Sequence, residues 1–199
     1  MKAAIIEVMR LTWPTVAIVA VIISIMRIVY LFNSDRKGFI LHKELYNLIF
    51  IIYILILFQL VTSQDLSGGG TNLTPFKEIL RYKIGSKEFY KQVIGNIILF
   101  IPLGYFASDK CKIKKFFGIT IISLVSSTTI EFVQKFIGRS FDVDDIILNV
   151  LGGICGYLLL VGVRAIRNRL PKMFKSDWFY NLLSIIFIIL VVLYLLKII

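Results

Sequence analysis

The sequence predicts an all-α membrane protein, a polytopic bundle of about six transmembrane helices. Hydrophobic residues make up 58% of the 199 positions and charged residues only 18%, whereas an average soluble domain is about 45–50% apolar. Several apolar stretches reach the roughly 17–25 residues that cross a bilayer core. Lysine and arginine gather mostly between these stretches, where lipid headgroups and topology signals account for the net charge of +11. The charge therefore indicates membrane lipids as partners and excludes nucleic acid.

The apolar stretches fall into two groups. Residues 13–32, 45–62 and 179–196 are long enough to span the membrane without help. Residues 93–107, 116–133 and 146–163 are shorter or are interrupted by Asn96, Pro102, Glu131 and Asn149. Polar groups at this depth are costly against lipid, so we expect the second group to form the centre of the bundle.

The basic residues also predict topology and organisation. With the N-terminus outside the cell, the cytoplasmic connections carry most of the lysine and arginine of the short loops, as the positive-inside rule requires. These residues are Arg36, Lys37, Lys43, Lys110, Lys112, Lys114, Lys115, Arg164, Arg167, Arg169, Lys172 and Lys175. We expect one helix and a loop over residues 1–44, a membrane core over 45–165, and a basic loop with the last helix over 166–199.

The connection between the second and third spans predicts an amphipathic helical segment that lies along the membrane. Thr74 and Pro75 suit the N-cap and first position of a helix that ends near Gly85, and Ser86 suits the N-cap of a second short helix. Its apolar residues recur at helical spacing beside basic ones, which suits an anionic lipid surface. The basic residues are Lys77, Arg81, Lys83, Lys87 and Lys91. Solvated charges on an ordinary loop are the alternative. We call residues 74–92 the interfacial segment.

A group of polar residues, here called the polar cluster, is the candidate functional site. Its members are Asn96, Glu131, Gln134, Arg139, Asp142, Asp144, Asp145 and Asn149. Glu131 and Gln134 share one face of the fourth span, and polar and small residues spaced by three and four share one face of the fifth. A short hairpin with a turn at Gly138 joins the two spans, so we expect the two faces to meet. Asn96 is expected to bond to Glu131 or Asn149.

The aspartates allow two interpretations. Asp142 as N-cap and Asp145 in the first helical turn would stabilise the fifth span by about 0.5–2 kcal/mol. Alternatively, the mutual repulsion of so many carboxylates calls for Arg139, shared protons or a cation. Ca²⁺ or Mg²⁺ accepts such oxygen ligands. The candidate metal ligands are then Glu131, Asp142, Asp144 and Asp145.

Several ordered motifs resemble the VanZ family. They are residues 72–76 (NLTPF), 95–104 (GNIILFIPLG), 131–134 (EFVQ), 138–145 (GRSFDVDD) and 149–153 (NVLGG). The resemblance covers about residues 45–165, and it implies a multi-pass protein of the bacterial cell membrane. The founding VanZ protein is associated with low-level resistance to the glycopeptide teicoplanin, and no settled reaction comes with the family. By this resemblance, all members of the polar cluster except Arg139 occupy family motif positions.

Three functions follow as hypotheses. The first is an envelope protein that engages an anionic lipid or cell-wall precursor at the outer leaflet and alters glycopeptide susceptibility. The second is an intramembrane enzyme that uses a carboxylate-bound cation to act on lipid-linked phosphates. The third is a structural partner protein whose acidic residues only lock a helical hairpin. An assay with a phospholipid or a lipid-linked precursor separates them. Turnover indicates the enzyme, retention without turnover the lipid-binding protein, and neither the structural partner.

Overall fold

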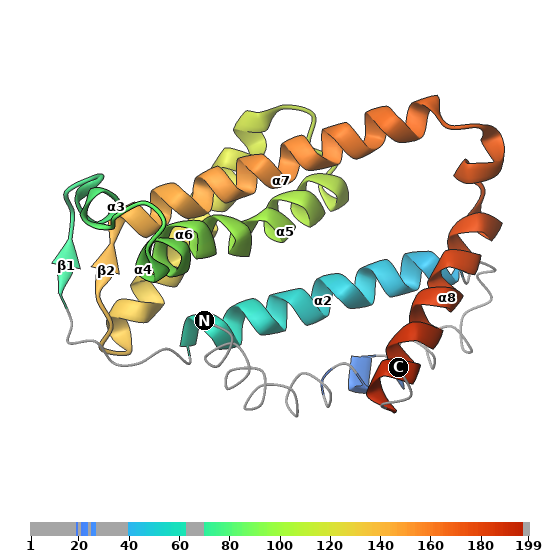
Figure 1. The fold of residues 1–199 in the computed structure, drawn as a ribbon, viewed down its shortest axis with the longest axis horizontal. Helices are drawn as coiled ribbons and strands as arrows, with labels where there is room; N and C mark the ends of the chain where they lie inside the picture. Colours follow the sequence, from blue (N-terminus) through green and yellow to red (C-terminus); the bar gives the residue numbers. More distant parts are fainter. Residues whose placement is uncertain (1–18, 20, 24, 27–39, 63–69, 197–199) are drawn as a thin grey trace. The chain divides into compact units, whose positions relative to one another are not determined.

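The structure is a computed structural model that describes residues 19, 21–23, 25–26, 40–62 and 70–196 (Figure 1). The predicted first span, residues 13–32, lies largely outside the described residues. The long helices are α2 (Leu41–Thr62), α5 (Gly95–Lys110), α6 (Phe116–Phe136), α7 (Val143–Arg169) and α8 (Asp177–Leu195). The short elements are β1 (Thr71–Asn72), α3 (Lys77–Arg81), α4 (Lys87–Phe89), the π-helical turn η1 (Tyr90–Ile94), β2 (Phe141–Asp142) and the 3₁₀ turn η2 (Lys172–Lys175).

Five helical stretches are long and apolar enough to cross a membrane. They are Leu41–Leu60, Lys87–Lys110, Phe116–Phe136, Val143–Arg169 and Asp177–Tyr194. Each overlaps one of the five predicted spans that fall on described residues, so the sequence prediction of an all-α membrane protein is confirmed. Within the part of the chain that is described, strand structure is limited to the two-residue β1 and β2.

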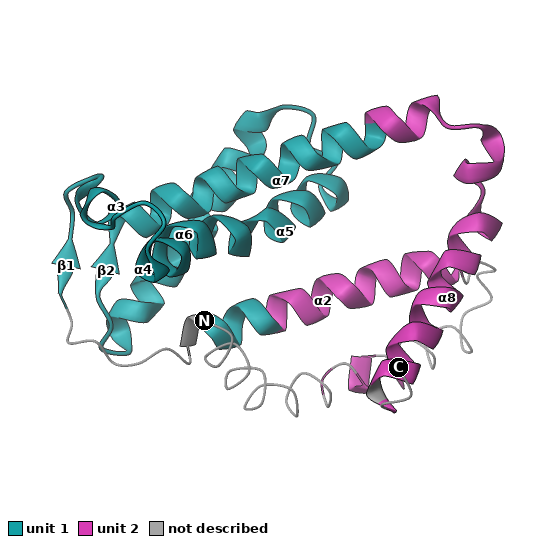
Figure 2. Ribbon diagram, in the orientation of Figure 1, with its two compact units in different colours: residues 1–12, 56–164 teal, residues 13–55, 165–199 magenta. Residues whose placement is uncertain are grey.

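The chain divides into two compact units, residues 1–12 with 56–164 and residues 13–55 with 165–199 (Figure 2). In the second unit, the first turn of α2 is joined to α8. The backbone N–H of His42 donates to Asn181 at 3.0 Å, and Lys43 lies 3.6 Å from Asp177. His42 lies inside α2, and neither it nor these partners belong to the polar cluster.

The core of the first unit is formed by α5, α6 and α7, with Phe100 and Ile119 fully buried. Backbone-to-backbone packing brings α5 against α7. A Cβ added to Gly104 would lie 2.0 Å from the carbonyl oxygen of Gly153, and one added to Gly156 would lie 2.1 Å from that of Ile101. The glycines of α7 therefore allow close helix packing.

A two-stranded parallel ladder joins the residues just before the interfacial segment to the α6–α7 hairpin. Thr71 pairs with Phe141 and Asn72 with Asp142, so β1 and β2 lie side by side in Figure 1. Gly138 has a φ of 86° and supplies the predicted turn of the hairpin, because glycine adopts this left-handed conformation without steric cost. The ladder places residues about 70 positions apart in sequence next to the start of α7.

The interfacial segment consists of short helices instead of the predicted longer one. Its first helix, α3, begins at Lys77 and ends at Arg81, so the predicted start at Thr74 and Pro75 and the predicted end near Gly85 are wrong. α3 starts later than predicted because the free N–H groups of this turn donate to the side chain of Asp144 in α7 and not to the Thr74 hydroxyl. The predicted cap at Ser86 is confirmed, since its hydroxyl accepts from the N–H of Phe89 at 3.1 Å.

Candidate functional site

The inner face of α6 carries polar residues at helical spacing. Ser123, Ser127 and Glu131 follow one another at intervals of four and are at most 1% exposed, which places them on one buried face. Glu131 accepts a hydrogen bond from the backbone N–H of Asp142 at 2.8 Å. The two polar faces therefore meet across the hairpin, as the sequence predicts.

Gln134 links Glu131 to Arg139. With its amide nitrogen turned toward Glu131, Gln134 donates to Oε1 at 3.0 Å and accepts from the Arg139 guanidinium at 2.5 Å, an orientation assigned from these partners. The backbone N–H of Arg139 also donates to the carbonyl of Gln134 at 2.9 Å. Burial lowers the pKa of Arg139, while Glu131 and Asp145 act in the opposite direction. Arg139 is thus a half-buried cation beside two carboxylates.

Asp142 caps α7. Its Oδ1 accepts from the backbone N–H of Asp144 at 2.8 Å and from the amide of Asn72 at 2.9 Å. The capping interpretation of Asp142 is confirmed, since a side-chain oxygen that accepts from the second N–H of a helix is the N-cap arrangement. Burial raises the pKa of Asp142, and these two hydrogen bonds oppose the rise.

Asp144 is 1% exposed and holds the start of α3. Its Oδ1 accepts from the backbone N–H of Phe76 at 2.5 Å, and its Oδ2 accepts from those of Glu78 at 2.7 Å and Ile79 at 3.1 Å. Phe76 itself has a φ of 67°, and its side chain makes no cap hydrogen bond. One carboxylate of α7 therefore satisfies the N–H groups that a local N-cap would otherwise satisfy. This contact fastens the interfacial segment to the start of α7.

The remaining members pair between helices. Asn96 donates to Asp145 at 2.5 Å, so the expectation that it bonds to Glu131 or Asn149 is wrong. The reason is geometric, because Asp145 projects from α7 toward α5 one turn closer to Asn96 than Asn149 does. Asn149 donates to Ser127 at 2.9 Å, and its Oδ1 is buried with no partner in the described part of the chain.

The four carboxylates do not converge in the way a cation site requires. Among the described residues, no group of three histidine, cysteine, aspartate or glutamate side chains is arranged to hold a metal ion. The oxygens of Asp144 face three N–H donors, and Asp142, Asp145 and Glu131 each accept from a donor of the protein. The predicted binding of Ca²⁺ or Mg²⁺ thus has no support in this arrangement, and no step below depends on it.

Two contributors to the site were missed in the sequence. Asn72 bonds to Asp142, and Ser127 bonds to Asn149. Ser127 precedes Glu131 by four positions, a spacing that places both on one helical face, so this contributor was detectable. The three backbone donors to Asp144 carry no side-chain signal at all.

The family model described as VanZ/LLP1 matches residues 45–166. This range is more than half of the 199 residues and contains every member of the polar cluster. No curated protein and no solved structure matches the chain.

Proposed function

Because the chain belongs to the VanZ/LLP1 family, we propose that it is a bacterial envelope protein that engages an anionic lipid or lipid-linked cell-wall precursor. This contact occurs at the outer leaflet, and it modulates susceptibility to glycopeptide antibiotics. The observation that carries the proposal is the attachment of the interfacial segment to the membrane core by Asp144. A buried carboxylate whose two oxygens both accept hydrogen bonds from one surface turn keeps that turn in a fixed position.

The chemistry of the interfacial segment suits an anionic membrane surface. Phe76, Leu80 and Ile84 are 53%, 81% and 83% exposed, although side chains of this kind are normally buried. Five basic residues, Lys77, Arg81, Lys83, Lys87 and Lys91, accompany them against two acidic ones, Glu78 and Glu88. Exposed apolar side chains beside basic ones favour insertion at the boundary between headgroups and acyl chains.

The polar cluster acts as the framework of the site. Asp142 holds Asn72 and the start of α7, Asp144 holds α3, and Asp145 holds Asn96 of α5. Each carboxylate is occupied by a donor of the protein, which favours a positioning role over metal-assisted catalysis. The lipid contact then belongs to the residues that the framework presents at the surface.

Purified full-length protein in detergent, mixed with labelled phosphatidylglycerol or a lipid-linked cell-wall precursor, tests the proposal. We expect the anionic lipid or the precursor to be retained and recovered unchanged, and phosphatidylcholine to be retained much less. Recovery of a cleaved product would instead assign the protein to the enzyme class. Equal retention of all lipids, or of none, would leave only the structural role.

A further inference from the structure

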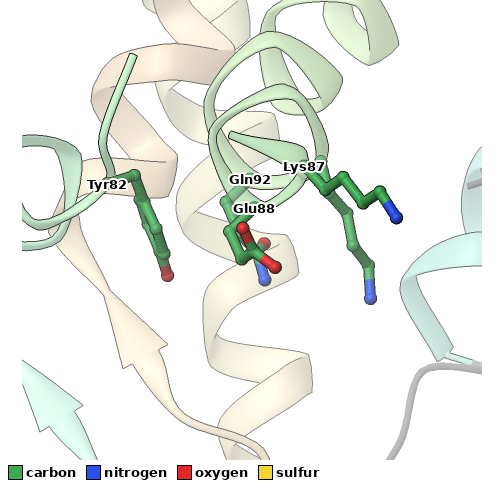
Figure 3. A pocket seen from close by; sticks show the side chains of 5 residues that line it. Tyr82, Lys87, Glu88 and Gln92 are labelled. Carbon is green, nitrogen blue, oxygen red and sulfur yellow. The ribbon is translucent and has the colours of Figure 1, made fainter. Parts of the chain in front are cut away.

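A cavity of about 310 Å³ lies between the end of the α3 turn and the helix that follows. Its lining residues are Tyr82, Lys87, Glu88, Lys91 and Gln92. Figure 3 shows the labelled side chains of Glu88 and Gln92 in the middle of the view, with Tyr82 on one side of them and Lys87 on the other. The volume is at the lower end of the roughly 300–1,000 Å³ typical of small-molecule sites. The cavity therefore has room for a headgroup rather than for a whole lipid.

The lining combines two ammonium groups and two neutral polar groups with one carboxylate. Lys87 and Lys91 are four residues apart and share a helical face, and the Tyr82 hydroxyl and Gln92 amide add neutral donors. Glu88 supplies the only carboxylate of the five lining residues. Within the described residues, the side chains of Lys87, Glu88, Lys91 and Gln92 make no hydrogen bond or ion pair to another part of the chain. Their polar groups are thus available to a ligand.

The Tyr82 hydroxyl lies within electrostatic reach of the polar cluster. Burial raises the pKa of the Tyr82 hydroxyl, Glu78 adds to the rise, and Asp145 and Asp142 contribute from the cluster side. The hydroxyl therefore keeps its proton at neutral pH and remains a donor. Because Tyr82 directly follows α3, its position depends on the turn that Asp144 holds.

We propose that this cavity binds the phosphate of a lipid headgroup that also carries a hydroxyl or ammonium group. Lys87 and Lys91 contact the phosphate, Tyr82 and Gln92 donate to its remaining oxygens, and Glu88 accepts from the hydroxyl or ammonium. Ile84 and Tyr90, which lie between lining residues along the chain, are 83% and 50% exposed and contact the acyl chains. The inference rests on the proposed function and names the place where the headgroup sits.

The test measures binding of short-chain phosphatidylglycerol, phosphatidylethanolamine and phosphatidylcholine to the detergent-solubilised full chain. The double variant Lys87→Gln with Lys91→Gln removes two charges from the cavity. The matched control, Lys114→Gln with Lys115→Gln, removes two charges from exposed positions between α5 and α6, outside both the cavity and the interfacial segment. Tyr82→Phe removes only a hydroxyl. The four lining residues other than Tyr82 are exposed, so the fold is expected to survive each change.

We expect phosphatidylglycerol binding to weaken about tenfold or more in the cavity variant and less than about twofold in the control, because charge-assisted contacts are strong only at short range. Tyr82→Phe should weaken it about threefold. Phosphatidylglycerol and phosphatidylethanolamine should bind more tightly than phosphatidylcholine, and Glu88→Leu, which removes the acceptor, should abolish the preference for phosphatidylethanolamine over phosphatidylcholine. Inorganic phosphate should compete only at concentrations far above that of the lipid.

Equal weakening in both double variants would show a diffuse charge effect and overturn the cavity assignment, while lipid retention by the unaltered protein would leave the proposed function standing. Binding of none of the lipids by the unaltered protein would contradict both. Competition by inorganic phosphate at the lipid's own concentration would show that free phosphate, and not a headgroup, is the ligand.

Discussion

Asp144→Asn is expected to release the interfacial segment while the membrane core stays folded. The native carboxylate accepts three backbone N–H groups, two of them on Oδ2. Asparagine has one side-chain oxygen, so its amide NH₂ faces at least one of these donors. Hydrogen bonds to a charged group contribute about 1.5–3 kcal/mol each, and the bonds that survive lose the charge. We therefore expect the free energy of local opening to fall by about 2–4 kcal/mol.

Hydrogen–deuterium exchange of the detergent-solubilised protein measures this opening. Amides of residues 76–82 should exchange about 30- to 700-fold faster in the variant, since about 1.4 kcal/mol corresponds to a factor of ten. Amides in the middle of α7 should not change. Asp177→Asn is the control, because that carboxylate lies on α8 and pairs at 3.6 Å with the exposed Lys43, a contact of little energetic weight. Unchanged exchange in residues 76–82, or faster exchange throughout the core, would refute the local attachment.

Three further predictions concern packing, topology and pH. Gly104→Ala should destabilise the protein by about 1–3 kcal/mol, because its Cβ would lie 2.0 Å from a carbonyl oxygen of α7, whereas Gly162→Ala has no atom within 4 Å and should leave the melting temperature unchanged. Cysteines introduced at Ser140 and Lys114 in a Cys-free background should differ on intact cells, with an impermeant maleimide labelling position 140 only; the reverse pattern would invert the topology. Burial raises the pKa of Asp142 above its ordinary 3.8. The contribution of this group to the stability of the protein is therefore lost as the pH rises from 3.8 through the raised pKa. Asp142→Asn should lack this pH-dependent contribution to stability. Parallel profiles of melting temperature against pH for the variant and the unaltered protein would contradict the raised pKa of Asp142.

The helices could be predicted from hydropathy because lipid leaves the backbone few alternatives. The same applies to features set by local chemistry, such as the Ser86 cap and the Gly138 turn. The meeting of Glu131 with Asp142 was also predictable, since a short hairpin joins two helices whose polar faces can be read from residue spacing.

The role of Asp144 could not be predicted in this way. Its partners lie 65 to 68 residues earlier in the chain and are backbone N–H groups, which every residue except proline has. Sequence reasoning therefore assigned the start of α3 to the local Thr74 and Pro75. The pairing of Asn96 with Asp145 was not predicted for a related reason, because depth in the membrane alone does not distinguish between polar side chains one turn apart, such as Asp145 and Asn149.

The most direct test of the central claim is the minimum inhibitory concentration of teicoplanin in a susceptible bacterium. Three cultures are compared: one with an empty vector, one expressing the unaltered chain, and one expressing Phe76→Ser with Leu80→Ser at equal membrane abundance. The two substituted side chains are 53% and 81% exposed, so the change affects membrane contact rather than the core. We predict that the unaltered chain raises the inhibitory concentration and that the variant returns it close to the empty-vector value. Full protection by the variant, or none by the unaltered chain, would contradict the claim that the interfacial segment modulates susceptibility by engaging an anionic headgroup.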